Sequence, residues 1–195
     1  MSATNCITLS NIDESLGCGQ DNMGGIVPKL FFGYWDDVDV WPDFPEPAQN
    51  ATSISMETAG KLVGDVVMKV GTCAYQIDFT DETGLFSIVP QGEKGGISFL
   101  YQLTFINKRI RALILGFLNA AKNRKMFFIV QDSNGTYYLM GDKRRGALLS
   151  TGDGAVTGTA TTDQNQVTSV FEYVSPRALT YEGDVEDLLE VRESE

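Results

Sequence analysis

The stretch FFIVQDSNGTYYLMGDKRRG, residues 127–146, indicates which kind of fold this chain adopts. Two apolar runs rich in aromatic and β-branched residues flank Ser133-Asn134-Gly135, where Asn and Gly accept the positive φ angles of a tight turn. The pattern predicts a β-hairpin. Asp132 also resembles the first ligand of a calcium loop, but an EF-hand needs further oxygen ligands and flanking helices, whereas two tyrosines follow here. We therefore interpret Asp132–Gly135 as a plain turn.

Outward from this hairpin, apolar runs predict strands along most of the chain. In residues 97–105 the apolar side chains occupy every second position, as in a strand with one buried face. Together with the run at 85–90, this segment is expected to form a long hairpin whose glycine-rich tip spans 90–96. The other expected strands cover 5–9, 26–35, 53–56, 62–70, 74–80, 155–161 and 167–174.

One segment has helical periodicity instead. In Asn107–Asn123 the apolar residues recur at the spacing of one helix face, namely Ile110, Leu113, Ile114, Phe117, Leu118 and Ala121. Asn107 is suited to cap the N-terminus, and Lys122 and Arg124 lie at the negative end of the helix dipole. The sequence thus predicts a mainly β protein, all-β apart from one amphipathic α-helix, built as a single domain over 1–195.

Two segments are expected to extend from this domain. Residues 36–53 combine Pro42, Pro45 and Pro47 with acidic side chains, which is typical of an exposed, extended loop. Residues 175–195 are expected to form an acidic C-terminal arm with a weak helical pattern in VEDLLEV.

The composition excludes several classes of function. The chain has no histidine and only three cysteines without paired spacing, which argues against histidine-based catalysis, histidine zinc sites and a disulfide framework. Adjacent acids such as Asp36 and Asp37 point apart on an extended chain, so we interpret them as solvated loop charge. We expect no enzyme activity, no cofactor and no metal site.

Charge and hydropathy also limit the partners. Acidic residues number 26 against 15 basic ones, for a net charge of −11. Such a protein repels nucleic acid, because nucleic-acid binding depends on cations that neutralise phosphates. No apolar run reaches the length of a bilayer-spanning helix, and the N-terminus lacks the basic head and apolar segment of a signal peptide. We expect a protein that folds in a cytoplasm and has no membrane partner.

Lys143, Arg144 and Arg145 stand out in this acidic chain. Their position between Gly141 and Gly146 suggests phosphate binding, but the order G-x-x-x-x-G-K-[ST] of a P-loop is absent and no helical pattern follows. Ion pairs with carboxylates, of the same subunit or of a neighbour, are the favoured interpretation.

The segments follow one another in a distinctive order. A short first strand with Cys6 precedes GGIVPKLFFGYWDDV at 24–38, the long hairpin and the helix, and FFIVQDSNGTYYLMG at 127–141 precedes a G-x-A-x-x-D-x-N segment at 158–165. This order resembles the tail tube proteins of tailed bacteriophages. The resemblance spans most of the chain, and its most specific piece is D-x-N-G followed by aromatic residues and Leu-Met-Gly. The long acidic 36–53 segment and the acidic C-terminus depart from it.

The resemblance implies a β-sandwich or half-barrel with a flanking helix, a long hairpin and terminal arms. It also implies a structural virion protein, assembled in the cytoplasm of a bacterial host, that polymerises as stacked hexameric rings to form the tail tube. DNA would pass through this tube into the host without specific binding, along an acidic wall. Expected partners are further copies of the chain, the tape measure, the tail tip or baseplate, the terminator and, in a contractile tail, a sheath.

Particular residues are assigned to these expected contacts. The candidates for contacts between subunits are Lys143, Arg144 and Arg145 and, at the hairpin tip, Gln91, Gly92, Glu93 and Lys94. The candidates for the channel wall are Gln76, Asp78, Thr80, Ser98, Gln102 and Thr104, polar residues that would equally suit the solvated outside of a sandwich. Alternative functions are a tail terminator or head–tail connector ring of the same virion, and a non-viral β-sandwich binding module.

Overall fold

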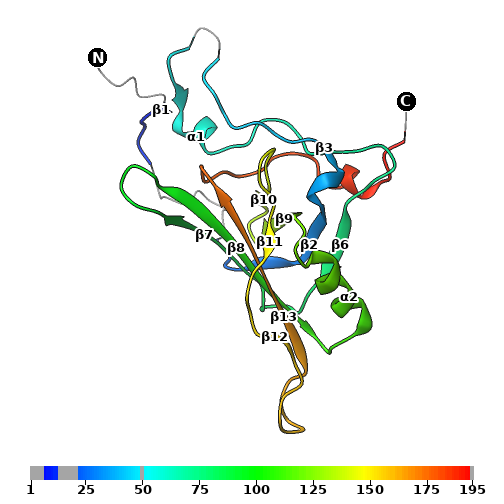
Figure 1. Ribbon diagram of the computed structural model, residues 1–195. Coiled ribbons are helices and arrows are strands. Elements are labelled where there is room, and N and C mark those ends of the chain that lie inside the picture. The colour runs from blue at the N-terminus through cyan, green and yellow to red at the C-terminus, as the bar shows by residue number, and fades with distance from the viewer. Residues whose placement is uncertain (1–6, 13–21, 49–50, 194–195) are drawn as a thin grey trace.

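Two antiparallel sheets form the body of the protein (Figure 1). The computed structural model describes residues 7–12, 22–48 and 51–193. The first sheet has the strand order β10-β9-β2-β6, and the second has the order β11-β13-β8-β7, with β12 also paired to β13. The bounds are β2 Ile26–Tyr34, β6 Tyr75–Asp78, β9 Met126–Asp132 and β10 Tyr137–Met140 in the first sheet, and β7 Leu85–Gln91, β8 Ser98–Lys108, β11 Leu148–Leu149, β12 Gly154–Val156 and β13 Gln166–Ser175 in the second. The mainly β fold predicted from the sequence is confirmed.

Smaller elements complete the chain. Strands β1 (Ile7–Thr8) and β4 (Ile54–Ser55) pair in parallel, and β3 (Val38–Val40) and β5 (Val67–Met68) pair antiparallel. The helical elements are α1 (Met56–Ala59), α2 (Ala112–Ala121) and the 3-10 turns η1 (Trp35–Asp37) and η2 (Asp187–Leu189). None of the helices in the described residues is long and apolar enough to span a membrane.

The main core lies between the two sheets. On β8 and β13 buried residues alternate with half-exposed ones, because neighbouring side chains of a strand point to opposite faces. Phe171 is fully buried there, and its ring lies 4.4 Å from that of Phe128 on the first sheet, measured between ring centroids. The side chain of Phe117 on α2 packs against the same cluster. The sheets therefore form a sandwich-like body with the helix at one side.

A second hydrophobic cluster covers the other face of the first sheet. Phe127 and Ile129 of β9 point into it, together with Trp41 and, from the C-terminal segment, Tyr181 and Leu188. Because β9 is covered on both faces, its first five residues are all buried, which explains why MFFIV has no polar alternation. The 36–53 and 175–195 segments therefore contribute buried residues, and the expectation that they form exposed arms is wrong for these parts.

The helix begins later than predicted. Asn107 is not its N-cap but a buried residue of β8, and the side-chain amide of Asn107 donates a hydrogen bond to the carbonyl of Asp78 at 2.8 Å. Pairing between β8 and β13 continues to Lys108, and Arg109 then adopts a φ of 67°, which breaks the strand. Sheet pairing thus overrides the helical periodicity of this stretch. Leu113, expected on the buried face, is 77% exposed.

Three other expectations differ in extent. The strand expected over 62–70 is reduced to β5, and the strand expected over 155–161 ends at Val156. Beyond it, the carboxylate of Asp163 accepts hydrogen bonds from the amides of Thr159 and Ala160, which closes a loop instead. The strand expected over 5–9 is β1, and Cys6 and Cys18 lie outside the described residues. Cys73 is a free, half-buried cysteine.

The buried hydroxyl of Tyr101 predicts a loss of stability at alkaline pH. It donates a hydrogen bond to the Arg177 carbonyl at 3.1 Å and accepts one from the Leu179 amide at 2.8 Å. Burial raises the pKa of Tyr101 from 10.0 to about 12, although the Leu179 amide opposes the shift. Because the folded-state pKa is the higher one, this contribution is complete below pH 10 and is lost as the pH rises to about 12.

The check is denaturant unfolding of the wild type and of Tyr101→Phe between pH 8 and pH 12. In the wild type the free energy of unfolding is expected to fall by about 1.4 kcal/mol per pH unit for this group above pH 10. Tyr101→Phe is expected to have a lower free energy of unfolding at pH 8, and this free energy is expected to fall less steeply with rising pH than that of the wild type. If the free energy of unfolding falls equally steeply with pH in the two proteins, groups other than Tyr101 cause the loss of stability at alkaline pH.

Candidate assembly surfaces

The turn Asp132–Gly135 is a scaffold element. One carboxylate oxygen of Asp132 accepts hydrogen bonds from the amides of Asn134 and Thr136 at 2.9 and 2.8 Å, and Gly135 has a φ of 92°. The Asn134 side chain in turn accepts the Met23 amide at 2.8 Å and donates to the Met23 carbonyl at 3.1 Å. Backbone donors thus occupy one oxygen of the Asp132 carboxylate, and the other accepts the Tyr138 hydroxyl at 3.4 Å. No cluster of metal-ligating side chains occurs among the described residues.

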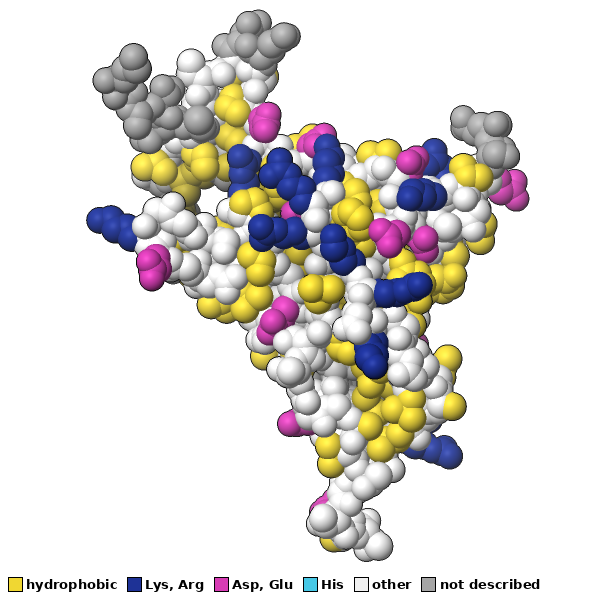
Figure 2. Space-filling model, in the orientation of Figure 1, with side chains coloured by type: hydrophobic (Ala, Val, Ile, Leu, Met, Phe, Trp, Pro, Cys, Tyr) yellow, Lys and Arg dark blue, Asp and Glu magenta, His cyan; other side chains and the backbone are white. Residues whose placement is uncertain are grey.

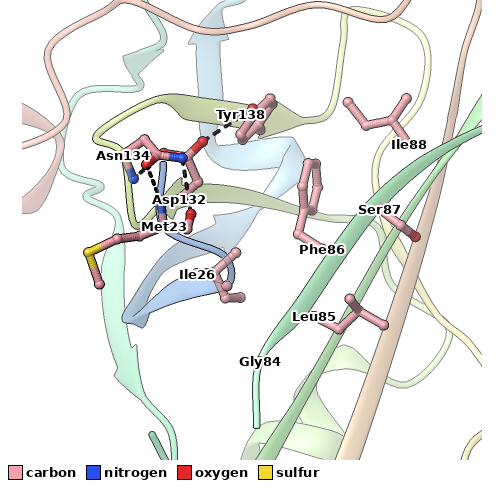
Figure 3. A pocket seen from close by; sticks show the side chains of 11 residues that line it. Met23, Ile26, Gly84, Leu85, Phe86, Ser87, Ile88, Asp132, Asn134 and Tyr138 are labelled. Carbon is pink, nitrogen blue, oxygen red and sulfur yellow. Dashed lines mark hydrogen bonds between the residues drawn. The ribbon is translucent and has the colours of Figure 1, made fainter. Parts of the chain in front are cut away.

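This turn borders a cleft beside strand β7 (Figure 3). The cleft has a volume of about 340 Å³ and runs between Gly84–Ile88 on one side and the turn with the start of β2 on the other. The rings of Phe86 and Tyr138, whose centroids lie 4.9 Å apart, are among its walls. Burial, and next the Asp132 carboxylate, raise the pKa of Tyr138. The cleft combines aromatic walls with a polar rim but brings together no catalytic constellation.

Strand β7 is an edge strand. It pairs with β8 over all of its seven residues, and no strand among the described residues pairs with its other side. Leu85 and Val89 are 61% and 49% exposed. A long edge with exposed apolar side chains can pair with a strand of another chain, and proteins usually cover or interrupt such edges. Pro90 interrupts this one only near the hairpin tip.

The hairpin tip projects beyond the sheets, at the left of Figure 1. The described candidates Gly92, Glu93 and Lys94 are exposed, and Gln91 ends β7. Gly92 has a φ of 108°, and a Cβ at this position would lie 2.6 Å from the Gly96 carbonyl oxygen, so the tight tip requires glycine here. The assignment of these residues to contacts between subunits stays a prediction.

The channel-wall candidates do not share one face. Gln76 and Asp78 lie on β6 of the first sheet and bond to each other at 2.8 Å, and Thr80 follows that strand. The remaining candidates, Ser98, Gln102 and Thr104, alternate with the core residues of β8 and therefore point outward from the second sheet. A single channel wall can include one group or the other.

The outward face of the second sheet is nearly neutral. The side chains that β7, β8 and β13 present on this face are mostly polar or aliphatic and at least partly exposed. They belong to neither core cluster. Among the described side chains that point outward from these strands, the charged ones are Glu172 and Lys108. The Glu172 carboxylate accepts a hydrogen bond from Gln102 at 3.0 Å. The acidic channel wall expected from net charge therefore has no counterpart in the strands of this face.

Asp142 builds the turn that carries the basic residues. Its buried carboxylate accepts hydrogen bonds from the amides of Arg144 and Arg145, at 2.6 and 2.8 Å, and from the Tyr173 hydroxyl at 2.8 Å. Burial, and next the Asp142 charge, raise the pKa of Tyr173, which keeps this donor protonated. The Asp142 carbonyl accepts the Trp35 indole N–H at 2.7 Å. The bonds to the two arginine amides thus close the turn, and the bonds from Tyr173 and Trp35 fix it to the body.

The three basic residues differ in whether they form an ion pair with the described residues. Lys143 forms an ion pair with Asp43 of the same chain, inside the 36–53 segment. Arg144 and Arg145 form no ion pair with the described residues and are exposed. Figure 2 shows Lys and Arg side chains gathered across the middle of one face, in the region where Figure 1 draws β10 and β11. The two arginines are therefore available for a partner, whereas Lys143 already has one.

A groove joins these arginines to the outward face of the second sheet. It has a volume of about 450 Å³, and Lys125, Arg144 and Arg145 line it together with the apolar side chains of Leu100, Leu148 and Val174. Sequence reasoning singled out the arginines but missed Lys125 and Asp142. An aspartate ahead of the turn KRRG is a signal for an Asx-type turn, but its burial against Tyr173 has no local signal.

Comparisons with known proteins identify no relative of this chain. No family model matches the sequence, and no curated protein or solved structure matches it either.

Proposed function

We propose that the chain is a structural subunit that polymerises as stacked, hexameric rings and forms the tail tube of a bacteriophage, through which DNA is delivered. The observation that carries the proposal is the seven-residue edge strand β7, open along one side and continuous with an outward sheet face that lacks a covering layer in the described residues. Edge-to-edge pairing between copies would close such sheets into a ring and remove the exposed edges. The order of segments along the sequence supports the same function.

The outward face of the second sheet is the favoured channel wall. It contains Ser98, Gln102 and Thr104, and its charged outward residues, Glu172 and Lys108, have opposite signs. Binding of duplex DNA depends on cations that neutralise phosphates, so a wall of this composition offers DNA little attraction. DNA would then slide past successive rings without being held.

A peptide-binding module is the second candidate function. The cleft in Figure 3 lies directly beside the open edge of β7 and has aromatic walls, which is an arrangement that suits a bound extended peptide. A binding module would remain monomeric at high concentration. A terminator or connector of the same virion would stop at a single ring.

Negative-stain microscopy and light scattering of the purified protein at increasing concentration separate these functions. Tubes with an open channel are expected. Single rings would favour the terminator or connector, and monomers at every concentration, including in the presence of tail-tip complexes as seeds, would contradict the ring proposal.

A lysine on the edge strand is expected to prevent assembly. Val89→Lys places a charge on a half-exposed position of β7, and edge lysines oppose pairing with a further strand. Assembly is expected to be lost while the free energy of unfolding of the monomer changes by only about 0.5 kcal/mol. The matched control is Val89→Thr, which keeps the β-branched shape without the charge and is expected to assemble. Normal tubes from Val89→Lys would exclude β7 from the ring interface.

A further inference from the structure

The basic groove has two arginines that form no ion pair with the part of the chain that the structure describes. Arg144 and Arg145 form no ion pair with the described residues, and Lys125 lies over the Trp35 ring at 4.6 Å from its centroid. Glu172 is the carboxylate that lines the groove, and it already accepts a hydrogen bond from Gln102. Four aliphatic side chains also line the groove, and one of them, Leu148, is 49% exposed. A fitting partner would combine several carboxylates with a small apolar side chain.

Two acids of the 36–53 segment, and Glu57 after it, are already in ion pairs. Asp43 pairs with Lys143, Asp39 pairs with Arg192, and Glu57 shares Lys61 with Glu182. Asp39 and Asp43 would have to give up these ion pairs in order to bind the groove of another copy. The 36–53 segment is therefore a poorer source of the partner than a segment whose acids form no ion pair with the described residues.

The segment Glu190–Glu193 has the required chemistry. Its backbone is fixed, because the Arg192 carbonyl accepts the Gly71 amide at 2.8 Å and the Arg192 guanidinium donates to the Met68 carbonyl at 2.8 Å. Arg192 is thereby turned toward its own chain, whereas Glu190, Val191 and Glu193 are exposed, Val191 by 57%. Asp65, Asp184 and Asp187 line the same surface. The segment thus presents a valine surrounded by carboxylates.

We propose that the basic groove formed by Lys125, Arg144 and Arg145 binds the segment Glu190–Glu193 of a second copy. This inference rests on the proposed function and names a second contact between neighbouring subunits, in addition to the β7 edge. The two surfaces share no residue, so the contact is heterologous: each copy offers a groove to one neighbour and a segment to another. Heterologous contacts generate closed rings or open filaments, as ring and tube formation requires.

Charge reversal on each side tests the contact. Arg144→Glu/Arg145→Glu makes both surfaces of a copy acidic, and Glu190→Arg/Glu193→Arg makes both basic. Each double variant alone is expected to self-associate at least about tenfold more weakly than the wild type near 50 mM salt, because like charges then face each other. An equimolar mixture is expected to recover association, since each acidic groove meets a basic segment and each basic groove an acidic one.

Sedimentation velocity measures the association, and microscopy of the same samples shows whether rings form. The matched control for the arginine variant, Arg111→Glu/Lys122→Glu, changes the net charge by the same amount at exposed positions outside the groove and is expected to assemble on its own. The contact is overturned if either reversed variant assembles like the wild type, or if the mixture stays dissociated while the wild type forms rings. If the mixture recovers association but neither it nor the wild type forms rings, the contact is supported and the proposed function is overturned.

Discussion

Replacing Phe171 with alanine is expected to lower the free energy of unfolding by about 3 to 5 kcal/mol. The Phe171 ring is fully buried between the two sheets. Its centroid lies 4.4 Å from that of Phe128, 5.8 Å from that of Phe117 and 6.2 Å from that of Phe105. Alanine would leave a cavity that borders both sheets and the helix, and closing it would require all three elements to move.

The measurement is denaturant unfolding followed by circular dichroism and by tyrosine and tryptophan fluorescence. Thr168→Ala, at an outward position of the same strand, is the matched control and is expected to cost less than about 1 kcal/mol. Similar losses for the two variants would mean that the sandwich core does not depend on the ring of Phe171.

Replacing Asp142 with alanine is expected to cost about 3 kcal/mol and to disturb assembly as well. The change removes the acceptor for the amides of Arg144 and Arg145 and for the Tyr173 hydroxyl. Tyr173 is 3% exposed, so its hydroxyl has little access to water as a substitute partner. The arginines would then lose the backbone geometry that places them at the groove.

Lys143→Ala separates the role of the turn from that of the neighbouring charge. It removes an ion pair whose side chains are 58% and 69% exposed, and such pairs contribute about 0 to 1 kcal/mol. Denaturant unfolding gives the stability, and sedimentation gives the association. An Asp142→Ala protein as stable as Lys143→Ala would refute the structural role that we assign to this carboxylate.

Local pattern was sufficient to predict the hairpins but not the helix start. In β7–β8 and β9–β10 the turn residues and the apolar runs point to the same structure, so the prediction needed no knowledge of the rest of the fold. Asn107 is different, because a long-range partner decides its state. Its strand pairs with β13, some sixty residues later, and the sequence around Asn107 carries no sign of that partner.

The assembly surfaces depend still more on contacts between distant residues. The sequence shows three consecutive cations, but only the folded chain brings Asp43 to Lys143 and leaves the arginines without an ion pair among the described residues. Likewise, polar residues at alternating positions predict that one strand face is exposed without revealing which sheet the strand joins. Gln76 and Gln102 look equivalent in the sequence and lie on different sheets.

Strand β9 is shared between the two hydrophobic clusters, and this affects how long an assembled subunit would survive. Tyr181 and Leu188 hold the C-terminal segment against one face of β9, so detachment of that segment would admit water to the centre of the first sheet. In a free subunit only contacts within the same chain hold the segment, namely this packing and hydrogen bonds such as those of Arg192. If a neighbouring groove also holds Glu190–Glu193, detachment must first break that contact, and bound neighbours stabilise only the folded state. Subunits of the proposed tube would then unfold more slowly than isolated subunits, because each one would hold the C-terminal segment of its neighbour in place.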